Sequence, residues 1–175
     1  MARLRSGSCY RTIKRPFTRK SKYRAKSFVR GVPNSKIVKF ELGNTKAKFS
    51  HSVHLVSNDS MQVRHNALES ARLAVNRYLT KYVGKDNYHL IIRVFPHHVL
   101  RENKLLAGAG ADRFQSGMKN PYGKPTGIAA QVRKGQEVIT VRLNEQHVQK
   151  AREGLIRASK KMPITARCSV AQNNN

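Results

Sequence analysis

The sequence predicts an α+β fold, with two helices packed on a mainly antiparallel or mixed sheet as an α/β sandwich. Two segments, 60–83 and 145–161, repeat apolar residues every three or four positions, which is typical of helices buried along one stripe. Several short segments rich in β-branched and aromatic residues are separated by glycine, asparagine and proline. The length of 175 residues and the apolar share of 39% suit one domain with a substantial core.

The expected strands are short and bounded by turn signals such as Gly43-Asn44 and Lys134-Gly135. The segment 88–95 has an almost continuous apolar middle, which favours a strand in the interior of a sheet. In the segment 136–143 the side chains alternate as expected for a strand buried on one face. The expected strands are KIVKFELG (36–43), AKFSHSVHLVS (47–57), YHLIIRVF (88–95), TGIAAQVR (126–133), QEVITVRL (136–143) and ITARCSV (164–170).

Both expected helices have recognisable ends. Asp59 or Ser60 is expected to cap the first helix and Gly84 to end it. Asn144 is expected to cap the second helix, and Pro163 stops it. The inward residues are expected to be Ala67, Leu68, Ala71, Ala74, Val75, Tyr78, Leu79 and Tyr82 in the first helix, and Val148, Ala151, Leu155 and Ala158 or Met162 in the second.

The net charge is the strongest indication of function. Thirty-five Lys and Arg face nine Asp and Glu, a formal charge of +26. Self-repulsion at this charge opposes compaction unless a polyanion neutralises it. Nucleic acid is the favoured partner, because Lys and Arg release condensed counterions when they meet its phosphates. An anionic membrane surface is the alternative, but no segment approaches the roughly 18 apolar residues of a membrane span, so no membrane partner is expected.

A basic arm is expected over residues 1–36, before a globular domain at 37–170 and a frayed tail at 171–175. Thirteen Lys and Arg precede the first acid, Glu41. The arm lacks helical or strand periodicity, so we expect it to be disordered alone and to order on RNA, with cations on phosphates. The expected RNA-binding residues are Arg3, Arg5, Arg11, Lys14, Arg15, Arg19, Lys20, Lys22, Arg24, Lys26 and Arg30.

A long functional loop is expected over residues 101–125, because structureless loops of this length are uncommon in compact domains unless they are functional or disordered. It contains LLAGAGADRFQSGM, whose small residues let the backbone approach a crowded surface. Arg113 and Lys119 are expected to hold phosphates. Phe114 and Gln115 are expected to stack on bases and hydrogen-bond to them.

The sequence carries no signature of an enzyme, a cofactor or a small-molecule substrate. The glycine pair at 108–110 lacks the third glycine of a dinucleotide-binding loop, and prolines follow it. His97 and His98 have no ligand partners at metal-binding spacing, and no CxxC pair occurs, so no metal is expected. Cys9 and Cys168 are expected to be free thiols, with a disulfide as the alternative. A free nucleic-acid-binding regulator is the rival class, but the two helices lie about 60 residues apart and do not form a helix-turn-helix.

Four stretches resemble the archaeal and eukaryotic L-ten-e branch of the universal L-sixteen ribosomal protein family. The early Cys9-Tyr10-Arg11 also fits, and the resemblance runs from about residue 3 to 170. It implies an α/β sandwich with a hammerhead-like β-extension. The chain ends at Asn175, soon after the last expected strand, which favours an archaeal-type member. The four stretches are RGVPNSKI (30–37), HHVLRENK (97–104), AGADRFQSGM (109–118) and YGKPTGIAAQVRKGQ (122–136).

The resemblance also implies a role as a cytoplasmic structural constituent of the large ribosomal subunit. Its partners would be large-subunit rRNA, A-site and P-site tRNA and neighbouring ribosomal proteins. The loop at 102–118 would approach the peptidyl transferase centre and the P-site tRNA end, and the protein would join the subunit late in assembly. Arg101, at the loop base, matches a functionally sensitive position. The loop residues implied are Arg101, Lys104, Gly108, Gly110, Asp112, Arg113, Phe114, Gln115, Gly117, Met118, Lys119 and Lys124.

Overall fold

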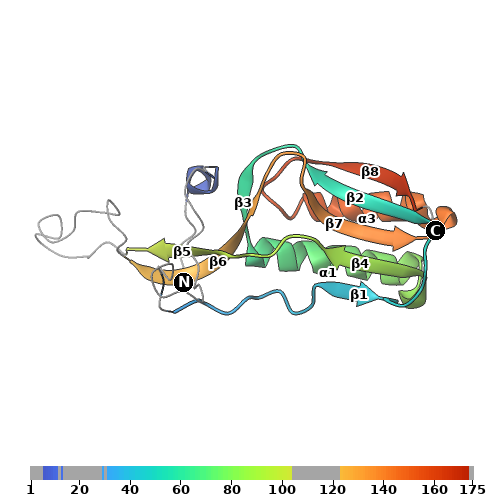
Figure 1. Ribbon diagram of the computed structural model, residues 1–175, viewed down its shortest axis with the longest axis horizontal. Helices are drawn as coiled ribbons and strands as arrows, with labels where there is room; N and C mark the ends of the chain where they lie inside the picture. Colours follow the sequence, from blue (N-terminus) through green and yellow to red (C-terminus); the bar gives the residue numbers. More distant parts are fainter. Residues whose placement is uncertain (1–5, 12, 14–28, 30, 104–122, 174–175) are drawn as a thin grey trace, which may run out of the picture.

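The computed structural model describes residues 6–11, 13, 29, 31–103 and 123–173. Within them the chain forms two antiparallel sheets and two long helices, so the predicted α+β fold is confirmed. Figure 1 shows an elongated molecule, in which one sheet and both helices make a body and the second sheet projects from it. Most of the predicted arm and the centre of the predicted loop lie outside the described residues.

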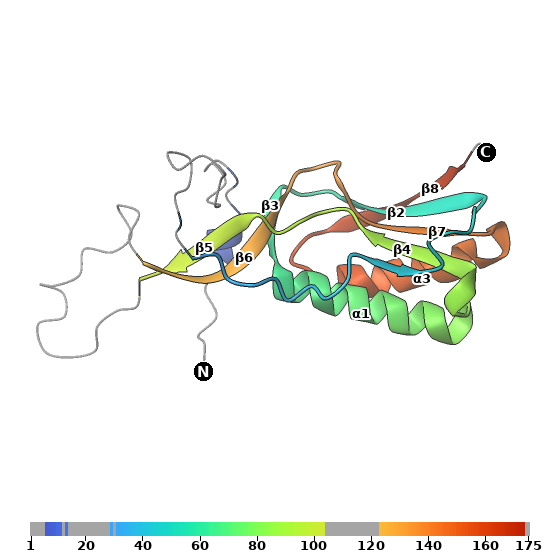
Figure 2. The same cartoon turned by 60° about the horizontal axis from the view of Figure 1, so that its bottom comes forward.

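The body contains a five-stranded antiparallel sheet in the order β1-β4-β7-β2-β8. Helices α1 and α3 lie side by side on the same face of this sheet, and neither covers the opposite face (Figure 2). The strands are Glu41–Gly43 (β1), His51–Ser57 (β2), Tyr88–Ile92 (β4), Glu137–Leu143 (β7) and Ala166–Gln172 (β8), and the helices are His65–Tyr82 (α1) and Val148–Ser159 (α3).

The projecting sheet, which we call the β-extension, has three antiparallel strands in the order β3-β6-β5. Strand β3 runs directly into α1, β4 leads into β5, and β6 leads through a tight turn into β7 (Figure 1). Strand β2 of the body also leads into β3, so several chain segments tie the β-extension to the body. The resemblance implied such a hammerhead-like β-extension. Its strands are Met61–Arg64 (β3), His98–Glu102 (β5) and Lys124–Val132 (β6).

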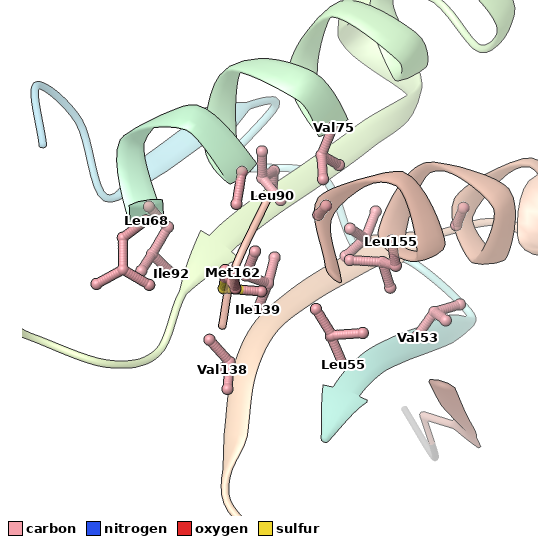
Figure 3. Close-up of a cluster of buried hydrophobic side chains, with 14 of the residues drawn as sticks. Val53, Leu55, Leu68, Val75, Leu90, Ile92, Val138, Ile139, Leu155 and Met162 are labelled. Atoms are coloured by element: carbon pink, nitrogen blue, oxygen red, sulfur yellow. The ribbon is translucent and has the colours of Figure 1, made fainter. Parts of the chain in front are cut away.

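The hydrophobic core lies between the helices and the helix-facing side of the five-stranded sheet. Leu68 and Val75 of α1 and Leu155 of α3 are completely buried. They pack above Leu90 and Ile139 on two neighbouring strands (Figure 3). A helical stripe and one face of a sheet meet here, and each such side chain contributes about 1.5–3 kcal/mol by leaving water.

Helix α1 differs from its prediction at one end and matches it at the other. It begins at His65 rather than at residue 60, because residues 61–64 pair with β6 as strand β3. The N-cap position is Arg64, whose side chain makes no capping hydrogen bond. The predicted end at Gly84 is confirmed, because this glycine has a φ of +88° and its N–H donates to the carbonyl of Leu79 at 3.1 Å.

The two residues predicted to cap α1 stabilise other segments instead. The carboxylate of Asp59 accepts hydrogen bonds from the N–H and the hydroxyl of Thr165, just before β8. The hydroxyl oxygen of Ser60 accepts a bond of 3.0 Å from the N–H of Lys134, in the turn between β6 and β7. The capping prediction was therefore wrong, because both side chains found partners that are distant in sequence.

The C-terminal elements also shift. A short 3-10 turn, Glu145–His147 (η4), precedes α3, and the side chain of Asn144 makes no capping bond. Strand β8 reaches Gln172, and the side-chain oxygen of Asn173 accepts a bond of 2.8 Å from the hydroxyl of Ser52. The chain is therefore ordered beyond residue 171, where the frayed tail was expected to begin.

The strand predictions need correction at several points. Strand β4 ends at Ile92, three residues early, and β1 covers only the end of its predicted segment. The ends of the predicted loop belong to strands, since β5 runs to Glu102 and β6 begins at Lys124. Strand β7 is buried on both faces, with Val138 and Thr140 almost fully inaccessible, because it is the middle strand of five.

Gly43 provides a test of the fold. Its φ is +86°, and a Cβ there would lie 2.2 Å from the carbonyl oxygen of Tyr88. We expect Gly43→Ala to lower the free energy of unfolding by about 2–4 kcal/mol, from backbone strain and the clash together. Gly135 is a matched control, because its φ is +81° but no atom lies within 4 Å of the added Cβ. Gly135→Ala should lower the free energy of unfolding by about 1–2 kcal/mol. If urea unfolding gave the same loss of stability for both variants, the clash at Gly43 would contribute nothing.

Candidate nucleic-acid interface

The described parts of the predicted arm lie on the β-extension. A 3-10 turn, Gly7–Tyr10 (η1), lies against β3, and the exposed Arg11 follows it. Val29 is buried together with Val99 of β5 and Ile128 of β6. The apolar contact of Val29 therefore holds this part of the arm against the β-extension. The other predicted arm cations lie outside the described residues: Arg3, Arg5, Lys14, Arg15, Arg19, Lys20, Lys22, Arg24, Lys26 and Arg30.

The tip of the β-extension carries the two predicted loop residues that the structure describes. Arg101 pairs with Pro125 across β5 and β6, and the exposed Lys124 pairs with Glu102. Gly123 has a φ of +102°, and a Cβ there would lie 2.9 Å from the carbonyl carbon of Glu102, so a side chain does not fit. The remaining predicted loop residues lie outside the described residues: Lys104, Gly108, Gly110, Asp112, Arg113, Phe114, Gln115, Gly117, Met118 and Lys119.

Acidic side chains are held by partners within the protein. Glu69 accepts hydrogen bonds from Nε and Nη2 of Arg72, at 2.8 and 2.5 Å, within α1. The Arg72 guanidinium lowers the pKa of Glu69 below its usual value, and Glu69 raises the pKa of Arg72. The Thr165 hydroxyl and N–H likewise lower the pKa of Asp59. Both carboxylates therefore stay ionised and are used for structure.

The face of the five-stranded sheet that lacks helices holds two more acids. Glu137 of β7 lies 3.3 Å from Nδ1 of His54 and 3.4 Å from Nε of Arg93. Glu41 of β1 lies 3.6 Å from Nε2 of His89 on the neighbouring strand. These groups come from different strands, so the contacts depend on the sheet register rather than on sequence spacing.

The outer surface of the helix layer combines cations with tyrosine rings. The guanidinium of Arg157 lies 4.4 Å from the ring centre of Tyr78, and the ammonium groups of Lys81 and Lys150 lie 5.2 and 5.7 Å from that of Tyr82. Glu153 accepts a hydrogen bond from the Tyr78 hydroxyl, which raises the pKa of that hydroxyl. The carboxylate of Glu153 is therefore hydrogen-bonded to a tyrosine hydroxyl. The three nearby cations remain exposed at the surface.

The consequence for binding is a large surplus of positive charge. Nine acids cannot neutralise 35 Lys and Arg under any arrangement. Because several of these acids are used for internal contacts, the exposed Lys and Arg are available to an external polyanion.

The junction between the body and the β-extension contains a buried histidine. His65 is 4% exposed, and neither its Nδ1 nor Nε of the adjacent Arg64 has a hydrogen-bond partner. Its Nε2 lies 3.6 Å from where a Cβ would stand at Gly127, so glycine leaves room for the ring. Burial, and then the charges of Lys36 and Arg64, lower the pKa of His65, so the imidazole is neutral at physiological pH.

Other chemistries find little support. The described residues hold no group of three or more His, Cys, Asp or Glu that could bind a metal. The His97 ring lies against that of Phe95 at a tilt of 45°, and His98 begins β5. Cys9 and Cys168 are free thiols, and burial raises the pKa of Cys168. No helix in the described part of the chain is long and apolar enough to cross a membrane.

Sequence reasoning missed one aromatic feature. The rings of Phe40 and Phe95 stack with their centres 5.2 Å apart, and the His97 ring lies 4.5 Å from that of Phe95. Pro96 between the two rings, which favours a turn, was a usable signal that Phe95 and His97 could lie close together. The local sequence does not predict that Phe40 packs against Phe95, because the two residues lie far apart in the chain.

An α+β body with a projecting β-extension and surplus cations defines a basic structural protein suited to a polyanionic partner. The sequence model of the family described as Ribosomal protein L16p/L10e matches residues 13–169. The chain belongs to this family of ribosomal proteins, which are structural constituents of the large ribosomal subunit, act in translation in the cytoplasm and are not an enzyme family.

Curated relatives match over nearly the whole length. The large ribosomal subunit protein uL16 of Staphylothermus marinus is 48% identical over 164 residues, which cover 94% of this chain and 91% of the relative. Its counterpart from Methanococcus maripaludis is 46% identical over 169 residues, covering 97% and 95%. That from Hyperthermus butylicus is 47% identical over 148 residues, covering 85% and 82%. The expected archaeal-type resemblance is confirmed.

The Glu69–Arg72 pair predicts a pH-dependent stability. The folded-state pKa of Glu69 is lowered, so the pair stabilises the protein above the usual value of 4.5, and this contribution is lost as pH falls through the folded-state pKa. We expect Glu69→Gln to cost about 1–3 kcal/mol at pH 7, because the charged hydrogen bonds are weakened. Urea unfolding of both proteins from pH 7 to pH 3 should show the difference shrinking. A constant difference would contradict the assignment.

Proposed function

We propose that this protein binds large-subunit rRNA beside the path of A-site tRNA, supports tRNA positioning and joins the subunit late in assembly. The arm anchors it through phosphate contacts. The β-extension carries the loop at 102–118 toward the peptidyl transferase centre and the end of P-site tRNA. The protein also contacts neighbouring ribosomal proteins.

The observation that carries the rRNA proposal is the uncompensated charge. The chain has a formal charge of +26. Four of its nine acids, Asp59, Glu69, Glu137 and Glu153, are held by partners within the protein. The phosphates of rRNA supply the missing negative charge over a large surface. The printed name of the archaeal relatives, large ribosomal subunit protein, supports the same partner.

The tRNA part of the proposal is supported by the geometry of the β-extension. Strands β5 and β6 project from the body and end together, where Glu102 pairs with Lys124 (Figure 1). Any segment that joins these strands must begin and end at this tip, away from the helices. A loop that starts there can reach into an RNA site while the body stays docked elsewhere.

The arm is tested by neutralising charge without disturbing its apolar contact at Val29. We expect replacement of six cations by glutamine to lower the affinity for large-subunit rRNA and to reduce the salt slope of binding by up to about five units, since each phosphate contact adds about 0.7–0.9. Neutralising Arg77, Lys81 and Lys150 on the helix layer is the control for general charge. An unchanged slope in the arm variant would refute the anchor. The six residues are Arg11, Lys14, Arg15, Arg19, Lys22 and Arg24.

The loop is tested in assembled subunits. We expect replacement of residues 107–117 by a glycine-serine segment of equal length to leave folding intact, because the strand pairing of β5 and β6 lies outside the change. The variant should sediment with large subunits but impair tRNA binding and peptide transfer. Wild-type activity would refute the tRNA role, and failure of the unaltered protein to sediment with large subunits would favour a free nucleic-acid-binding regulator.

A further inference from the structure

The segment that joins β4 to β5 runs through the junction of the body and the β-extension (Figures 1 and 2). Along residues 93–97, burial alternates: Val94 and Pro96 are buried, and Arg93, Phe95 and His97 are exposed. A γ-turn at Pro96 brings the His97 ring next to that of Phe95. Phe95 leaves 48% of its surface exposed.

The rings form a stack with one fixed end. Phe40 packs against the hydrophobic core and supports Phe95, with ring centres 5.2 Å apart and planes 21° from parallel. The His97 ring lies 4.5 Å from Phe95 at 45°. Main-chain hydrogen bonds hold the backbone, from the Ile92 N–H to the Phe40 carbonyl at 2.8 Å and from the His97 N–H to the Phe95 carbonyl at 3.0 Å. A ring held this way has little freedom to lose on binding.

We propose that this stack is a platform for an unpaired RNA base, which lies against the exposed surface of Phe95 and His97. Unpaired rRNA bases are recognised by stacking on aromatic rings, and an exposed, braced phenylalanine on a strongly basic chain suits that contact. The inference rests on the proposed rRNA-binding function and adds a base-binding site to the phosphate-binding arm.

The local charges favour a base over a phosphate. Arg93 is engaged with Glu137 at 3.4 Å, and Glu41 follows Phe40 directly in the chain. The cation among these exposed side chains, Arg93, therefore already has an acidic partner. A base contributes stacking without releasing counterions, so this site should raise affinity without changing the salt dependence.

The test compares the full chain with Phe95→Leu, which keeps apolar contact with Phe40 but removes the ring. The probes are single-stranded RNA oligonucleotides of equal length, one with all its bases and one with internal abasic positions. Over a salt series, Phe95→Leu should weaken binding of the base-bearing probe by about 5- to 150-fold. The salt slope and the affinity for the abasic probe should stay the same. Phe95→Tyr should restore binding, because it keeps the ring.

Tyr82→Leu is the matched control, because Tyr82 is also 48% exposed but has Lys81 and Lys150 placed over its ring. It should change affinity less than about 2-fold. Equal losses in Tyr82→Leu and Phe95→Leu, or unchanged binding by a folded Phe95→Leu, would overturn the platform while leaving rRNA binding intact. Failure of the wild-type chain to bind large-subunit rRNA would instead overturn the proposed function and the platform with it.

Discussion

The structure depends on where a chain of charge +26 places its few acids. Like charges at short range repel most strongly where water is excluded, so each buried or half-buried cation needs a neutral or acidic neighbour. Arg72 obtains one from Glu69 within the same helix, and Arg93 obtains one from Glu137 across the sheet. Acids used in this way stabilise the body, and the cations at the surface remain for an external polyanion.

The β-extension depends on contacts from outside its own three strands. A three-stranded sheet has a small apolar interior, and Val29, Val99 and Ile128 form the separate cluster that fills it. Its strands are nevertheless continuous with the body through α1, β4 and β7. The body therefore holds the orientation of the β-extension, and the predicted arm adds apolar surface that its own three strands lack.

The sequence predicted the elements that carry their own periodicity and missed those created by distant partners. The apolar stripe of α1 and the glycine at its end were readable locally. Strand β3 was not, because its four residues continue without a break into the helix and become a strand only by pairing with β6. Strand β5 was not predicted either: it follows Pro96, and only its last two residues fell within the predicted loop at 101–125. The surplus of cations was visible in the composition, whereas the Phe40–Phe95 stack required the fold.

The junction shows how strictly the charge constraint applies inside the molecule. His65 is buried where the two sheets meet, beside Arg64 and within the field of Lys36. Burial first, and then the charges of Lys36 and Arg64, disfavour a protonated imidazole there and lower the pKa of His65. Because the unfolded chain binds this proton more readily, protonation destabilises the folded state as pH falls below the usual value of 6.5. A neutral histidine therefore lets polar side chains fill the junction without adding to the repulsion that the rest of the chain must accommodate.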